Sequence, residues 1–279
     1  MTAVSQHKTS VGHVLSTSSW LDTHFEACRE EYETMLAFAG FPPGVAVLDA
    51  GCGSGSFLAS LTLNGARTVH ALDIAQEHLS FLHAHGQGCL GLLACGVVSA
   101  VPLATDCVDG VWCANTLQFL DLDEAEDALR EFARVVRPGG TVAVKDVDMT
   151  GFKVAPAPPL LGPHLADACI TGKDVATESC GSLRGRELRT MMQQAGFRNV
   201  RQRSFLIERW GPLNGQDAAF WREWLPYLAG LAERRGVPGA DLETWRQVST
   251  PEAADTYIAR DDFYGSELQV VCTGIAVRA

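Results

Sequence analysis

Short apolar runs alternate with amphipathic stretches along most of the chain. The runs predict buried strands, since each is bounded by glycine, proline or acidic residues. The expected strands are residues 45–48, 68–72, 89–94, 108–113, 141–147, 199–208 and 268–277. Three- and four-residue apolar spacing predicts helices at 20–39, 57–64, 75–85, 123–136 and 182–195. Alternation of strand and helix indicates a doubly wound α/β sheet with parallel, right-handed connections.

Two regions interrupt this alternation. Residues 148–182 are rich in proline and predict a loop with one helix at 164–171, and residues 211–262 have a mostly helical pattern. The last strand has no simple crossover helix before it, so we expect it to be antiparallel. These patterns predict an N-terminal segment and helix at 1–40, a core of 41–210 and 263–279, and a helical lid insertion at 211–262.

Composition narrows the class of ligand and the cellular compartment. The 279 residues are 47% hydrophobic, enough for a sizeable core, and the net charge of −11 disfavours a basic nucleic-acid-binding face. No apolar run approaches the ~20 residues of a membrane span, so we expect no membrane association. Nine cysteines without a C-x-x-C pair favour reduced thiols in the cytoplasm, and predict neither disulfides nor a metal site.

The stretch VLDAGCGSG at 47–55 carries the most specific chemistry. A buried strand ends in Asp49, and three glycines then form a tight turn before a helix whose free N–H groups face a ligand. A carboxylate at Asp49 would repel a pyrophosphate and attract an ammonium or sulfonium group. Asp73 ends the second strand and can accept the hydroxyls of a ribose. Simpler interpretations are a turn cap for Asp49, a helix N-cap for Asp73 and a small filler for Cys52.

The chain resembles the class I S-adenosylmethionine-dependent methyltransferases. The matching stretches are VLDAGCGSG (47–55), ALD (71–73), SAVPLATDCVDGVWCANTLQFL (99–120) and REFARVVRPGGTVAVKD (130–146). Residues 20–32 and 261–271 look like the small-molecule branch that acts on quinones and secondary metabolites. The resemblance implies a Rossmann-like core and S-adenosyl-L-methionine as cofactor.

The resemblance also implies roles for individual residues. Asp49 would hold the amino group of the cofactor, and Asp73 its ribose. The family usually has a Gly-Asp pair after the third strand, where this chain has Gly96-Val97, so the adenine contact would come from the backbone of Val97 and Val98. The full set of expected cofactor-binding residues is Asp49, Gly51, Cys52, Gly53, Asp73, Ile74, Val97, Val98, Asn115 and Thr116.

The methyl acceptor is expected at the carboxyl ends of the parallel strands, under the N-terminal helix and the lid. A base is needed only if the acceptor must lose a proton. The catalytic candidates near this edge are His24, Tyr32, Asp148 and Tyr264, with Glu267 as a further acid. For His24, packing on a helix face is the simpler interpretation, and for Asp148 it is a loop cap.

The main hypothesis is methyl transfer to O, N or C of a small, largely apolar metabolite. One alternative is an S-adenosylmethionine-binding enzyme that catalyses a cyclisation or rearrangement instead. The second alternative is a nicotinamide-dependent dehydrogenase. The third is a non-catalytic binding module, whose lid helix could form a homodimer face. Nucleic-acid methylation is disfavoured, since residues 115–118 read Asn-Thr-Leu-Gln and lack an Asn/Asp-Pro-Pro-aromatic sequence.

Overall fold

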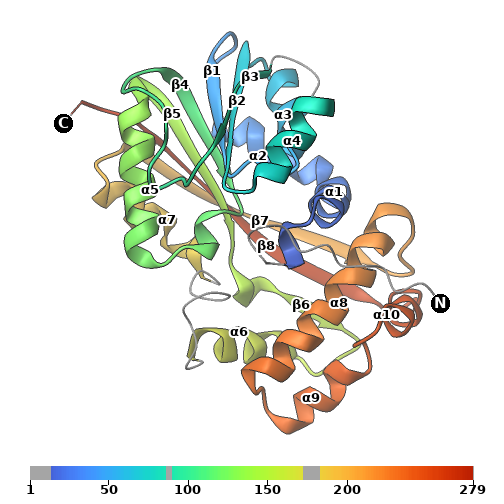
Figure 1. The fold of residues 1–279 in the computed structure, drawn as a ribbon. Coiled ribbons are helices and arrows are strands. Elements are labelled where there is room, and N and C mark those ends of the chain that lie inside the picture. The colour runs from blue at the N-terminus through green and yellow to red at the C-terminus, as the bar shows by residue number, and fades with distance from the viewer. Residues whose placement is uncertain (1–13, 86–89, 172–182, 279) are drawn as a thin grey trace.

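A mostly parallel sheet with helices on both faces organises the chain (Figure 1). The computed structural model describes residues 14–85, 90–171 and 183–278. The strand order is β3-β2-β1-β4-β5-β8, with β7 on the other side of β8. The strands are β1 Ala46–Ala50, β2 Thr68–Asp73, β3 Leu90–Cys95, β4 Val108–Ala114, β5 Val136–Val147, β6 Lys153–Ala155, β7 Arg198–Trp210 and β8 Tyr264–Ile275. Strands β1 to β5 pair in parallel, and β8 is antiparallel to β5, β6 and β7, which confirms the predicted sheet.

Apolar helix faces bury the two sides of the sheet separately. Helices α2, α3 and α4 pack on one face, and α5 and α7 pack on the other. The helices are α1 Ser18–Ala27, α2 Arg29–Ala39, α3 Ser56–Leu63, α4 Gln76–His85, α5 Leu122–Val135, α6 Leu161–Thr171, α7 Arg184–Gln194, α8 Gly215–Arg235, α9 Gly239–Arg246 and α10 Pro251–Ile258. In α5, a capping box between Asp121 and Glu124 satisfies the first free N–H groups.

Three local predictions were wrong. The single helix expected at 20–39 is divided at Cys28, whose φ of −115° and ψ of 12° are not helical, so α1 and α2 take different directions. The strand β3 is half-exposed instead of buried, because it lies at the edge of the sheet. The short β6 lies in the segment predicted as a loop. Ser182, the expected cap of α7, lies outside the described residues.

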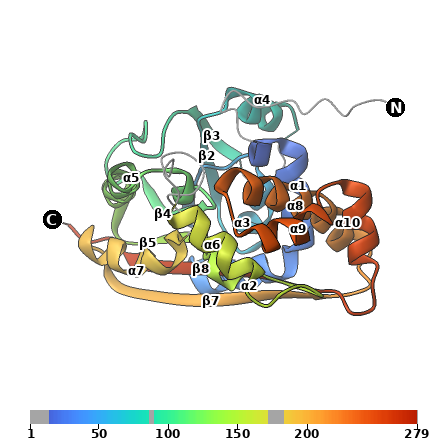
Figure 2. The same ribbon diagram turned by 90° about the horizontal axis from the view of Figure 1, so that it is seen from below.

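The helical insertion lies beyond the carboxyl ends of the parallel strands. The long strands β7 and β8 extend past the core and carry α8, α9 and α10 between them, and α1 packs against α8 (Figures 1 and 2). The half-buried Arg209 at the end of β7 binds Glu31 of α2 at 2.7 Å and Asp217 of α8 at 2.5 Å. His164 of α6 bonds Asp241 of α9 at 2.5 Å.

Within the described ranges, no helix is both long and apolar enough to span a membrane.

The stability of the sheet depends on the buried face of α5, which can be tested with two leucines of that helix. Leu129 is fully buried and Leu122 is 53% exposed. We expect Leu129→Ala to lower the free energy of unfolding by about 2–5 kcal/mol, because it leaves a cavity. The control Leu122→Ala should change it by less than about 0.5 kcal/mol. Urea denaturation followed by circular dichroism measures both, and equal effects would contradict the assigned packing.

Candidate active site

The glycine turn after β1 has a backbone conformation with positive φ, which residues other than glycine adopt only with strain. Gly51 and Gly53 have φ values of 78° and 53°. A Cβ at Gly51 would lie 2.1 Å from Oγ1 of Thr116, so the turn lies directly against the residue that follows β4. The N–H groups of Gly51 and Cys52 donate to the carbonyl of Leu72, at 2.8 and 3.0 Å. The turn is therefore fixed between the ends of β1, β2 and β4.

Two buried carboxylates flank this turn. Asp49 is 1% exposed, and its Oδ2 has no hydrogen-bond partner among the residues that the structure describes. Burial, and then the nearby charge of Asp73, raise the pKa of Asp49 from 3.8 to about 8. Asp73 accepts from the N–H of Gly53 and of Ala75, both at 2.8 Å, and lies 3.1 Å from Nδ1 of His78. The protein thus supplies hydrogen bonds to both carboxylate oxygens of Asp73, whereas Oδ2 of Asp49 receives none from the described residues.

The remaining expected cofactor residues lie at the same edge. The N–H of Gly96 donates to the carbonyl of Asp73 at 3.0 Å, which brings the loop of Val97 and Val98 next to β2. Ile74 and Val97 are exposed, and Val98 is buried. Asn115 follows β4 with a φ of 52°, and its N–H donates to the carbonyl of Lys145. The sequence thus predicted one contiguous group of residues, although their contacts with a cofactor stay predictions.

Helix α1 covers the glycine turn. A Cβ at Gly53 would lie 2.6 Å from Cδ1 of Leu21. The hydroxyls of Ser54 and Ser56 donate to Asp22 at 2.7 and 3.1 Å. Helix α1 therefore packs directly against the glycine turn in this structure.

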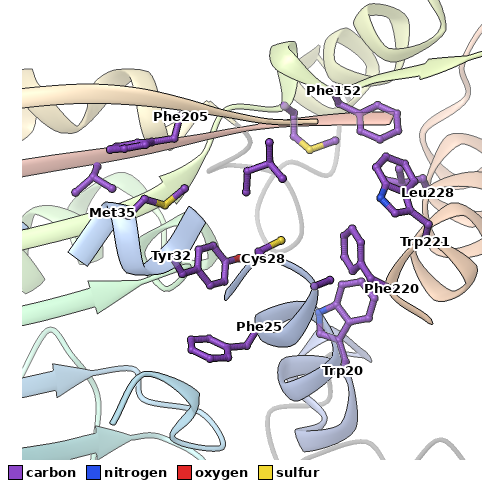
Figure 3. Close-up of a cluster of buried hydrophobic side chains, with 14 of the residues drawn as sticks. Trp20, Phe25, Cys28, Tyr32, Met35, Phe152, Phe205, Phe220, Trp221 and Leu228 are labelled. Atoms are coloured by element: carbon purple, nitrogen blue, oxygen red, sulfur yellow. The ribbon is translucent and has the colours of Figure 1, made fainter. Parts of the chain in front are cut away.

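A second group of polar side chains comes from α1, α2, β5 and β8 and from the residue between the two helices. We call it the buried polar cluster, and its members are His24, Cys28, Tyr32, Lys145 and Glu267. The Tyr32 hydroxyl lies 3.1 Å from Nε2 of His24, and the same nitrogen lies 3.6 Å from the Glu267 carboxylate. The Lys145 ammonium lies 3.4 Å from the Tyr32 hydroxyl and donates at 2.7 Å to Oδ1 of Asn115. Asn115 therefore links the cluster to the glycine turn. Figure 3 shows Tyr32 and Cys28 among the surrounding apolar side chains.

Burial and mutual charge set the protonation of this cluster. Burial lowers the pKa of Lys145 to about 8 and raises the pKa of Tyr32 and of Cys28 well above their usual values. Burial acts to raise the pKa of Glu267, but the bond to His24 and the charges of His24 and Lys145 outweigh it and leave that pKa lowered. The cluster thus combines a carboxylate with a lowered pKa and an ammonium whose pKa is below that of a free lysine.

Two of the four catalytic candidates lie together, and the other two each have different partners. His24 and Tyr32 lie together, with Glu267 beside them. Asp148 instead binds Arg186 at 2.9 and 3.0 Å and accepts from the N–H of Thr150. Tyr264 donates to Glu208 at 2.9 Å, and its ring contacts the exposed Trp210. The catalytic roles of all four stay predictions.

Sequence reasoning missed Lys145 and Cys28. The only available signal for Lys145 was a basic residue within the apolar strand 141–147. The donor atoms of His24, Cys28 and Glu267 lie within 4.8 Å of one another, as in a site that could hold a metal ion. The expectation of no bound metal therefore stays a prediction.

Comparison with known proteins gives a family for the central part of the chain. Residues 48–144 match the family model of a methyltransferase domain. A malonyl-[acyl-carrier protein] O-methyltransferase of Pectobacterium atrosepticum is 36% identical over 122 residues, which cover 44% of this chain and 46% of the relative. The methyltransferase GfsG of Streptomyces halstedii is 27% identical over 137 residues, 48% of this chain and 49% of the relative. The chain thus spans about half the length of these curated relatives.

Solved structures extend the likeness of fold to nearly the whole chain. A phosphoethanolamine N-methyltransferase 2 of Haemonchus contortus, solved with S-adenosyl-L-methionine, covers 95% of this chain with a TM-score of 0.53. The match takes in 59% of that protein at 14% identity, so it concerns the fold alone. Residues 48–144 are therefore assigned to the methyltransferase domain family, and beyond these residues the likeness is one of fold alone.

Proposed function

We propose that the protein transfers a methyl group from S-adenosyl-L-methionine to O, N or C of a small, largely apolar metabolite. The observation that carries this proposal is the unpartnered, buried oxygen of Asp49 beside the positive-φ glycine turn. A buried carboxylate oxygen without a partner is costly, and a cationic ligand offsets that cost by a charge-assisted hydrogen bond. Among nucleotide ligands, the amino group and sulfonium of S-adenosyl-L-methionine satisfy this requirement, and a dinucleotide pyrophosphate does not.

The other expected contacts are compatible with this cofactor. A carboxylate offers about four acceptor positions, and Asp73 uses three of them on Gly53, Ala75 and His78. A ribose hydroxyl would share or use the remaining one. When bound, the cofactor supplies an electrophilic methyl group on sulfur. The residues of this chain hold it in place, orient the acceptor and exclude water.

The side of α1 away from the glycine turn supports an apolar acceptor. Trp20 of α1 lies 5.5 Å from the rings of both Phe220 and Trp224 of α8. His24 stacks on Phe220 with 4.8 Å between ring centroids. These aromatic rings adjoin the buried polar cluster, so an acceptor there would meet an apolar wall with a few polar groups at one end. His24 and Tyr32 are the proposed catalytic residues at that end.

Cofactor binding can be tested with one charge-removing substitution. We expect wild-type protein to bind S-adenosyl-L-methionine in isothermal titration calorimetry. Asp49→Asn should weaken binding by about 1–3 kcal/mol, roughly 5- to 150-fold in Kd, because the amide cannot form the carboxylate that would pair with a bound cation. The exposed Asp123 provides the matched control, and Asp123→Asn should leave Kd unchanged. No binding by the wild type, or equal effects of the two substitutions, would refute the proposal.

The reaction itself is tested by mass spectrometry of metabolite extracts incubated with the protein and cofactor. Methyl transfer predicts an acceptor heavier by one CH2 unit and an equal amount of S-adenosylhomocysteine. A product of unchanged mass without S-adenosylhomocysteine would instead indicate a cyclisation or rearrangement.

The raised pKa of Asp49 also predicts how folding stability depends on pH without ligand. The folded state favours the protonated carboxyl, so this contribution is complete below the unfolded pKa of 3.8 and is lost as pH rises towards about 8. Asp49→Asn cannot ionise and avoids this loss. Between about pH 5 and pH 9, the stability of Asp49→Asn relative to wild type should increase by at least about 1 kcal/mol. Urea unfolding at several pH values measures the difference, and a constant difference would show that Asp49 ionises normally.

A further inference from the structure

Lys145 is a fully buried cation whose hydrogen-bond partners are neutral. It is 0% exposed in β5, and within the described chain its ammonium bonds Oδ1 of Asn115 and the Tyr32 hydroxyl. The ammonium also lies 4.5 Å from the centre of the Tyr32 ring. Taking an ammonium out of water costs several kcal/mol unless an anion or strong acceptor faces it. The charge of Glu267 acts on the ammonium, but among the described residues no carboxylate is hydrogen-bonded to it, so Lys145 is free to pair with an anionic oxygen of a ligand.

A proton path leads away from the same point. The Tyr32 hydroxyl lies between the Lys145 ammonium and Nε2 of His24, at 3.4 and 3.1 Å. The Glu267 carboxylate lies 3.6 Å from that Nε2, and Gln269 donates to Glu267 at 3.1 Å. A proton received by His24 would therefore be stabilised by a fixed negative charge. Tyr32 can accept from one side and donate to the other, as a relay requires.

Aromatic side chains lie next to His24, at one end of this proton path. His24 is stacked on Phe220, and Trp20 and Trp224 complete a group of rings at the contact of α1 with α8. The indole N–H of Trp224 is buried without a hydrogen-bond partner. Flat rings that surround a polar end are suited to a flat, conjugated ligand with one ionisable group. Such a ligand can enter only if α1 and α8 separate, because their side chains fill this contact.

We infer that the buried polar cluster is the acceptor site and that the acceptor carries an acidic hydroxyl on a conjugated ring or enol. Lys145 pairs with the acceptor oxygen, and Tyr32 and His24 remove its proton, with Glu267 as the counter-charge. This inference rests on the proposed function and deepens it from O, N or C to an oxygen of this kind.

The step balances in atoms and charge. The acceptor O–H gives its proton to the Tyr32 oxygen as Tyr32 gives its own to Nε2 of His24, which becomes an imidazolium beside Glu267. The acceptor oxygen forms a bond to the methyl carbon, and the carbon–sulfur bond breaks with its electron pair left on sulfur. The products are the methyl ether and S-adenosylhomocysteine, and His24 later releases the proton to water.

A metal ion is the competing use of the same side chains, since the donor atoms of His24, Cys28 and Glu267 lie within 4.8 Å of one another. Two observations oppose it. The Lys145 ammonium within the cluster would repel a metal cation, and Nε2 of His24 is already in hydrogen-bond contact with Tyr32. The proton path uses these same contacts without conflict.

The test uses 4-nitrophenol, whose phenolate absorbs at a different wavelength from the phenol. The probe is added to the complex of the protein with S-adenosylhomocysteine, about one pH unit below the probe's own pKa, where the free probe is about nine-tenths protonated. We expect saturable growth of the phenolate band, since bound probe loses its proton to the cluster. Lys145→Met should weaken this binding about 10- to 100-fold. Tyr32→Phe and His24→Gln should leave the bound probe protonated.

The controls separate the possible failures. Lys153→Met, on the exposed Lys153 of β6, should match wild type. Retained S-adenosylhomocysteine binding in calorimetry shows that each variant is folded. Absence of that binding in the wild type would overturn the proposed function and this inference with it. If the wild type binds S-adenosylhomocysteine, three results would overturn the inference alone: no saturable phenolate signal, equal binding by both lysine variants, or stoichiometric metal in the purified protein by mass spectrometry that Cys28→Ser removes.

Discussion

The burial of unbalanced charge at one edge of the sheet is the constraint on which the site depends. Among the described residues, Oδ2 of the buried Asp49 at the end of β1 has no hydrogen-bond partner. Within the same residues, the buried Lys145 near the end of β5 bonds only neutral groups. A fold that only had to be stable would replace these groups by apolar residues of similar size. In the proposed function, the carboxylate of Asp49 would pair with a cation and the ammonium of Lys145 with an anion, and Asn115 bonds Lys145.

The local part of the site could be predicted from sequence because it depends on neighbours along the chain. A glycine turn after an apolar strand fixes Asp49, Gly51 and Gly53 within a few residues, and the strand ending in Asp73 must lie beside it in a parallel sheet. The positive φ values of the glycines follow from the same pattern.

The acceptor side could not be predicted in this way because it depends on register and on helix direction. The pairing of Lys145 with Val271 and of Val147 with Gln269 brings β8 alongside β5, and this register depends on how the long insertion between β7 and β8 folds back. Side chains alternate across a strand, so the sequence alone did not say whether Lys145 or Asp146 would face α2. The break at Cys28, which aims α1 across the sheet edge, depends on packing against α8.

Helix α1 has one further consequence for access. Leu21 lies over Gly53, and His24, one turn later, reaches Glu267 of β8. Both contacts belong to one rigid ten-residue helix. A movement of α1 that carried Leu21 away from Gly53 would also move His24 relative to Glu267. If the proposed donor and acceptor sites lie on either side of α1, binding at one site would therefore change the surroundings of the other.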